Sequence, residues 1–192
     1  MDIVGFIRSL TFTDVLIFVV LAAAFVWGYM QGVVRQLLGL GVTIVAFILA
    51  ANLRGPVGGW LGDNWTAFPT AFSDMVGFLV VFVVLVVAGN AAIQLTYRHA
   101  PLLSAVSMAD EILGGILALV AMMLLIAAFV FVLDSYYRNN AVPLSGDVGW
   151  LRDVHGALDK AALVNFIRGG LIPGFLTLLG PLVPDIVHSL VR

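Results

Sequence analysis

Few residues of this sequence could carry chemistry, and their types and spacing limit what that chemistry would be. Asn90 and Gln94 lie four residues apart in an otherwise apolar stretch, which places both amides on one face of a helix. Amides inside a membrane either hydrogen-bond to neighbouring helices or line a pathway. We expect both side chains to face other helices, with interhelical hydrogen bonding as the simpler role and a pathway as the alternative.

The acidic residues give no catalytic pattern. They stand at the ends of apolar segments rather than at their centres: Asp14, Asp110, Glu111 and Asp134. A carboxylate at the start of a helix caps free N–H groups and suits the positive end of the helix dipole, which accounts for the first three. A proton-coupled transporter would place an acid or a histidine near the middle of a span, and these spans have none there.

The histidines and serines also lack the spacing of a metal site or a nucleophile. His99, His155 and His188 fall in three separate segments. His155, close to Asp153 and Asp159, is expected on a solvated helix face. The sequence has no Gly-x-Ser-x-Gly elbow and no glycine-rich phosphate loop. It therefore predicts no catalytic residues, no cofactor and no metal.

The composition identifies the elements that must position these residues. Of the 192 residues, 62% are hydrophobic and 10% are charged, against roughly 45–50% and about 25% in soluble domains. A net charge of −2, with nine scattered Lys and Arg, leaves no basic stripe for nucleic acid. The absence of cysteine excludes a disulfide scaffold and thiol catalysis. These values predict an integral membrane protein whose main partner is the lipid bilayer.

Four uncharged stretches are long enough to cross that bilayer. They predict an all-α membrane domain with four transmembrane helices, at about 14–34, 36–53, 74–97 and 110–134. Ala22 to Ala24 resemble a signal-peptide cleavage site, but the apolar run continues beyond them. The glycines and the proline of residues 55–60 predict a loop between the second and third helices.

Residues 136–192 form a different part of the chain, with a polar linker and an apolar, interrupted tail. Within it, apolar residues recur on one helix face: Leu151, Val154, Leu158, Ala162 and Phe166. This pattern predicts an amphipathic C-terminal helical extension, on the membrane surface or against the bundle. Prolines and glycines interrupt 171–179 and 182–190, so we expect an interfacial tail, with a re-entrant segment as the alternative.

Gly28 and Gly32 have the spacing that permits close approach of helix backbones. Because they lie where the first predicted helix leads into the second, we expect them to let these two helices pack within one chain.

The same hairpin resembles the colicin V production protein (CvpA) family. In that family an Asp opens an apolar helix, a Gly-x-x-x-Gly turn follows, and a basic residue precedes the second helix. The matching residues here are Asp14, Gly28, Gly32 and Arg35. A second similarity lies at the start of the fourth helix, where Asp110 and Gly114 match and Glu111 stands in place of the usual Arg. The resemblance covers roughly 14–133 and short proline-marked pieces of the tail, with no counterpart for 136–160.

The resemblance implies a multi-pass protein of the bacterial inner membrane that supports colicin V production and export and envelope homeostasis. The family has no catalytic residues or cofactor to carry over. We expect a non-enzymatic scaffold or assembly subunit that associates with itself or with other envelope membrane proteins. The alternative is a small oligomeric channel or transporter with Asn90 and Gln94 facing its path.

Four spans place both termini on one side of the membrane. The positive-inside rule places the termini in the cytoplasm only if the Lys and Arg residues of the tail are counted. Relatives with an exported protease domain after this segment favour the opposite side, and we expect the termini outside.

Overall fold

The computed structural model describes residues 11–65, 69–96, 107–138 and 149–179. The regular elements in these residues are helices, and four of them are long: α2 (Phe12–Gln31), α3 (Val33–Asn64), α4 (Thr70–Thr96) and α5 (Ser107–Tyr137). Each is long and apolar enough to cross a membrane. The predicted fold class, an all-α membrane protein with four spans and a helical extension, is confirmed.

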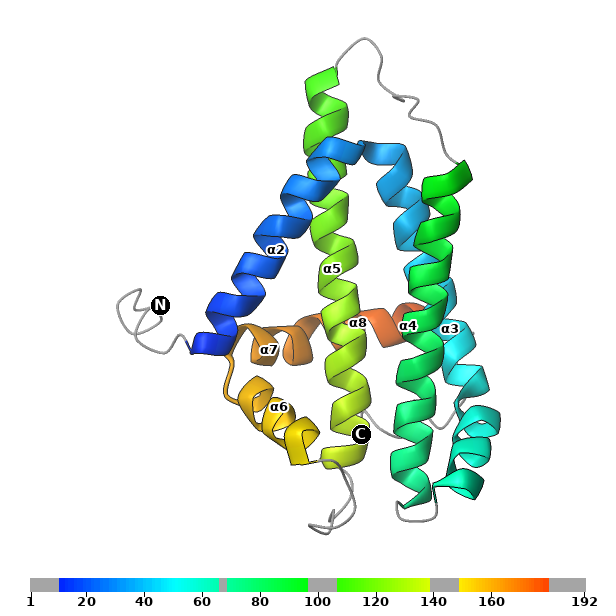
Figure 1. Cartoon of the computed structure of the whole chain (residues 1–192). Coiled ribbons are helices and arrows are strands. Elements are labelled where there is room, and N and C mark those ends of the chain that lie inside the picture. The colour runs from blue at the N-terminus through cyan, green and yellow to red at the C-terminus, as the bar shows by residue number, and fades with distance from the viewer. Residues whose placement is uncertain (1–10, 66–68, 97–106, 139–148, 180–192) are drawn as a thin grey trace.

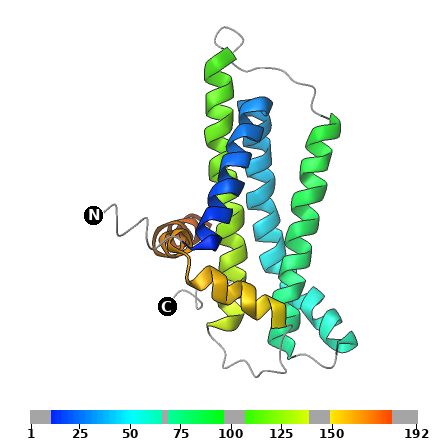
Figure 2. The ribbon, with the colours of Figure 1, turned by 60° about the vertical axis from the view of Figure 1, so that its left-hand side comes forward.

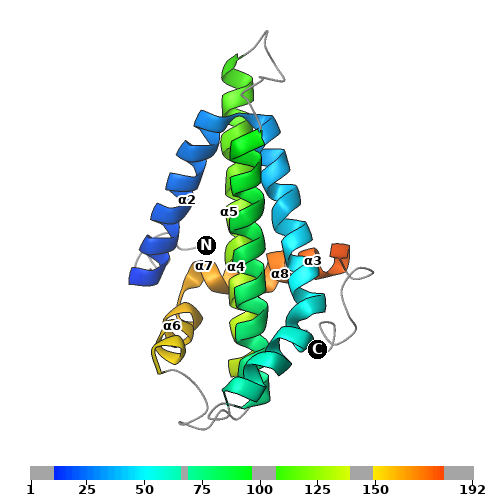
Figure 3. The ribbon, with the colours of Figure 1, turned by 45° about the vertical axis from the view of Figure 1, so that its right-hand side comes forward.

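A single residue joins α2 to α3. Gly32 has a φ of 77°, which side chains with a Cβ rarely adopt, so a glycine here allows the chain to reverse within one residue. From this joint α2 and α3 diverge, and α5 lies beside α2 while α4 lies beside α3 (Figures 1 and 3). We call the half of the bundle near Gly32 the hairpin half, and the opposite half, where residues 149–179 pack, the extension half.

The loop predicted at 55–60 is wrong, because α3 continues as a helix to Asn64 and contains Pro56. The helix instead changes direction in its last part (Figure 3), as expected where proline removes a backbone hydrogen bond. Of the glycines there, Gly58 packs against α4, whereas a Cβ on Gly55 or Gly59 would meet nothing within 4 Å. A Cβ on Gly77 of α4 would lie 2.9 Å from the backbone nitrogen of Gly58, so the two helices touch through their backbones. The other three predicted helices coincide with observed ones to within four residues at each end.

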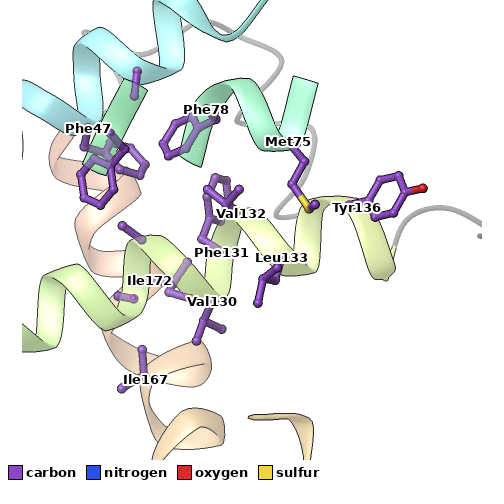
Figure 4. Packing of buried hydrophobic residues seen from close by; sticks show 14 of the residues in the cluster. Phe47, Met75, Phe78, Val130, Phe131, Val132, Leu133, Tyr136, Ile167 and Ile172 are labelled. Atoms are coloured by element: carbon purple, nitrogen blue, oxygen red, sulfur yellow. The ribbon is translucent and has the colours of Figure 1, made fainter. Parts of the chain in front are cut away.

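Aromatic rings fill the extension half. Phe47 is 1% exposed, and its ring centroid lies 5.5 Å from that of Phe78, 6.3 Å from Phe82 and 6.3 Å from Phe131. Figure 4 shows this cluster between α3, α4 and α5, with Ile167 and Ile172 of the extension beneath it. The edge-to-face arrangement is the favourable one for aromatic pairs.

The C-terminal extension crosses the bundle at this end (Figures 1 and 2). It consists of α6 (Gly149–Asp159), α7 (Ala162–Phe166), the π-helical turn η1 (Ile167–Leu171) and α8 (Ile172–Leu179). The continuous helix predicted through the apolar stripe is wrong. Ala161 has extended backbone and ends the stripe, so Leu151 is buried while Phe166 is 66% exposed. Of the two placements left open, the structure supports packing against the bundle, because α6 contacts α5.

Candidate functional site

Gly28 of α2 faces α5 rather than α3. A Cβ on Gly28 would overlap the Ala118 side chain and lie 2.6 Å from the Gly114 carbonyl oxygen. A Cβ on Gly114 would lie 2.8 Å from the carbonyl carbon of Gly32. The expectation that Gly28 and Gly32 serve packing of α2 on α3 is therefore corrected. These two glycines and Gly114 form one backbone contact between the hairpin and α5, which we call the glycine junction.

Asp110 and Arg35 flank this junction. Asp110 is 4% exposed, and its Oδ1 has no hydrogen-bond partner among the described residues. Arg35, in the first turn of α3, is half-buried. Neither residue belongs to an ion pair within the described part of the chain. Two of the three family-motif charges, Arg35 and Asp110, thus lie at the same end of the bundle without pairing.

A groove of about 520 Å³ lies in the hairpin half, between all four long helices. Its walls are mostly apolar, and Gln36, Thr43 and Asn90 supply its polar groups. Asn90 donates from Nδ2 to the Val86 carbonyl at 2.8 Å, and Thr43 donates to the Gly39 carbonyl at 3.0 Å. Gln94 lies one helical turn further along α4, but it is exposed and does not line the groove, so the expectation that it faces other helices is wrong.

Asp14 connects α2 to the extension. It is 1% exposed and completes a capping box with Thr11, whose backbone N–H donates to Asp14 Oδ2 at 2.9 Å. Its other oxygen, Oδ1, accepts from the backbone N–H of Leu163 at 2.9 Å. One carboxylate therefore caps its own helix and the start of α7. The capping role expected for Asp14 is confirmed, and its second partner, 149 residues away in sequence, was outside the reach of local spacing.

A buried ion cluster fastens the rest of the extension. Arg168 of η1 donates from Nε to Asp134 Oδ2 at 2.7 Å and from Nη2 to Asp134 Oδ1 at 2.6 Å. Both side chains are largely buried, at 9% and 16% exposure. This two-pronged pairing of a guanidinium with a carboxylate is among the strongest polar contacts in proteins. It joins the end of α5 to η1.

His155 and Asp159 of α6 extend this cluster. His155 Nε2 lies 3.0 Å from Asp134 Oδ1, and its ring stacks on Tyr137 with 4.9 Å between centroids. The expectation of a solvated His155 is wrong, because α6 turns that face toward α5. Arg168 also donates to Asp159 Oδ1 at 2.6 Å, and Arg138 lies 3.5 Å from the same oxygen.

Hydrogen bonds and nearby charges favour the charged forms of Asp159 and Arg168. The hydrogen bond from Arg168 holds the pKa of Asp159 below its usual value, against the opposing effect of burial. Burial alone would lower the pKa of Arg168, but the hydrogen bonds and charges of Asp134 and Asp159 raise it above its usual value. These salt bridges and hydrogen bonds hold α5, α6 and η1 together. The described part of the chain contains no group of three or more potential metal ligands.

The fold and these sites define a polytopic helical membrane protein whose C-terminal extension is fastened to its transmembrane bundle. The chain belongs to the colicin V production protein family, because the family model matches residues 13–167. The match includes α6 and α7, so it reaches further than the resemblance seen in the sequence, which found no counterpart for 136–160. No curated protein and no solved structure matches the chain.

Proposed function

We propose that this protein is a non-enzymatic scaffold or assembly subunit of the bacterial inner membrane that supports colicin V production and export and envelope homeostasis. The observation that carries the proposal is the fastened extension. Asp14 and Asp134, on two different spans, hold α7 and η1 by hydrogen bonds. The extension is thereby a fixed surface at one face of the bundle, which is what a partner protein needs for docking. The family to which the chain belongs supplies the link to toxin production.

The packing of the extension half also favours a scaffold. Phe47 follows Thr43 of the groove by one helical turn and is surrounded by other rings. A solute entering the groove of a single copy would meet this cluster. The second candidate, an oligomeric channel or transporter, is favoured by the groove itself and by its polar residue Asn90.

Complementation tests the scaffold function. In bacteria that lack their own family member, the wild-type chain should restore secretion of colicin V. Asp134→Asn should restore it poorly at equal membrane abundance, because the variant loses the charge that holds Arg168. Asp153→Asn, which changes an exposed carboxylate on the same extension, should behave as wild type.

Flux measurements separate the two candidates. Purified protein in liposomes should give no solute flux above that of empty liposomes. A flux that Asn90→Leu abolishes would overturn the scaffold proposal in favour of the channel. Full secretion by Asp134→Asn would show that secretion does not depend on how the extension is held.

A further inference from the structure

A second, smaller cavity lies in the extension half, away from the groove. Its volume is about 120 Å³, and residues of α3, α4 and α5 line it. Its polar lining residues include Arg54, Asp74 and Ser135, while Met75 and Phe78 are among its apolar residues. Figure 4 shows the side chains of Met75 and Phe78 on α4 near the residues of α5. The exposed residue Ala71 also lines the cavity, which therefore reaches the surface of the bundle.

The sequence places this cavity at the depth of the lipid headgroups. Arg54 directly follows the apolar run of α3, Asp74 directly precedes that of α4, and Ser135 follows that of α5 by two residues. Three spans thus leave the hydrocarbon layer at one level. The polar groups of the cavity lie where phosphate and amine groups of phospholipids lie.

The two charges in the cavity have opposite signs but do not pair with each other. Arg54 and Asp74 are both half-buried, and among the described residues no ion pair within 4.0 Å joins them. The lack of a side chain at Gly58 leaves room for the Asp74 carboxylate, because a Cβ at this position would overlap Asp74 Oδ1. Half-buried charges that form no close ion pair are costly unless another group neutralises them.

We propose that this cavity binds the phosphoethanolamine headgroup of a membrane phospholipid, with the phosphate at Arg54 and the ammonium at Asp74. A guanidinium matches the oxygens of a phosphate, and a primary ammonium donates three hydrogen bonds to acceptors such as a carboxylate. The cavity volume of about 120 Å³ lies well below the roughly 300 Å³ at which drug-sized pockets begin. A small headgroup suits that space. The trimethylammonium of choline is larger and has no N–H to donate to Asp74.

Native mass spectrometry of the full-length protein tests the proposal. Protein is extracted from liposomes with equal amounts of phosphatidylethanolamine, phosphatidylcholine and phosphatidylglycerol, and the retained lipids are counted. Wild type should retain phosphatidylethanolamine about 10-fold over phosphatidylcholine. Asp74→Asn should abolish this preference, and Arg54→Gln should reduce retention of both phosphatidylethanolamine and phosphatidylglycerol. Asp63→Asn, an exposed carboxylate near the end of α3, is the matched control and should leave the preference unchanged.

Three outcomes would overturn the proposal. Equal retention of the three lipids by the wild type would show that the cavity does not select phosphoethanolamine. An unchanged preference in Asp74→Asn would show that Asp74 does not bind the ammonium. Displacement of the lipid by millimolar free phosphoethanolamine, with equal protection of the protein against heat, would assign the site to a soluble zwitterion. If Asp74→Asn fails to fold, Arg54→Lys replaces it, because it keeps the charge and should lower phosphatidylethanolamine retention through the lost two-pronged contact. The secretion assay is not part of this test, so the headgroup site and the scaffold function can fail separately.

Discussion

The two halves of the bundle solve the same packing problem in different ways. Lipid tails are as apolar as the helices, so association inside a membrane depends on close contact rather than on the hydrophobic effect. In the extension half, most contact comes from interlocking rings around Phe47 and from the ion cluster around Asp134, with one backbone contact between Gly58 and Gly77. In the hairpin half it comes from backbones that touch at the glycine junction, beside a groove of about 520 Å³. The larger cavity therefore lies in the hairpin half, and the half that carries the extension contains the smaller one of about 120 Å³.

The largest loss in the free energy of unfolding should come from a substitution in the ring cluster around Phe47. Phe47→Ala would remove the ring that contacts three others and should lower the free energy of unfolding by about 3–5 kcal/mol. Unfolding in mixed micelles by increasing fractions of sodium dodecyl sulfate, followed by circular dichroism, measures it. Val83→Ala on the lipid-exposed face of α4 is the control and should cost little. Equal costs for the two substitutions would mean that the cluster is not the stable part of the bundle.

The next largest effect should come from the ion cluster. Asp134→Asn removes the charge that Arg168 and His155 share and should cost about 1.5–3 kcal/mol, the range for hydrogen bonds to charged groups. Release of the extension is read by trypsin cleavage in detergent, at the lysine and arginine residues of the extension. Faster cleavage than in Asp153→Asn is expected. Identical cleavage would show that Asp14 and apolar packing hold the extension without the cluster.

In the hairpin half, the glycine junction is the point to test. Gly28→Ala would place a Cβ against Ala118 and Gly114, and overpacking of this kind costs about 1–3 kcal/mol. Gly41→Ala on α3 is the matched control, because a Cβ there meets nothing within 4 Å. The same unfolding measurement should show a loss for the first variant and none for the second. A loss confined to Gly41→Ala would contradict the assignment of the junction.

The sequence predicted the spans because length and uncharged composition decide membrane insertion without reference to neighbours. It predicted the end of α3 wrongly, since Gly55, Pro56 and Gly58 have the composition of a turn. Whether glycines form a turn or a helix contact depends on what approaches them, and here α4 approaches Gly58. The same limit applies to Gly28, whose partner on α5 is 86 residues away.

Local sequence patterns could not predict the ion cluster, for a related reason. Asp134 is the one helix-end acid among the four that capping does not explain, and no local pattern marks Arg168 as its partner. An acid at the C-terminal end of a helix is unfavourable next to the helix dipole, so its position was a signal that a cation lies nearby. Spacing could not name that cation, because the pair is separated by 34 residues and a break at Ala161.

The smallest effect concerns Asp159, whose carboxylate is 48% exposed and therefore partly screened. Its pKa in the folded protein is lowered by Arg168 from the usual 3.8, which the unfolded chain keeps. The stability from this pair is thus fully present above about pH 4 and is lost as the pH falls through the lower folded value. Spin labels on Ala157→Cys and Asn64→Cys, in a chain without natural cysteine, report the distance from α6 to the end of α3. The distribution should stay narrow from pH 7 to pH 5 and broaden below pH 4. Asp159→Asn should broaden it modestly at every pH, while Asp153→Asn should leave it unchanged. Broadening that begins between pH 7 and pH 6 would contradict the assignment of the effect to Asp159.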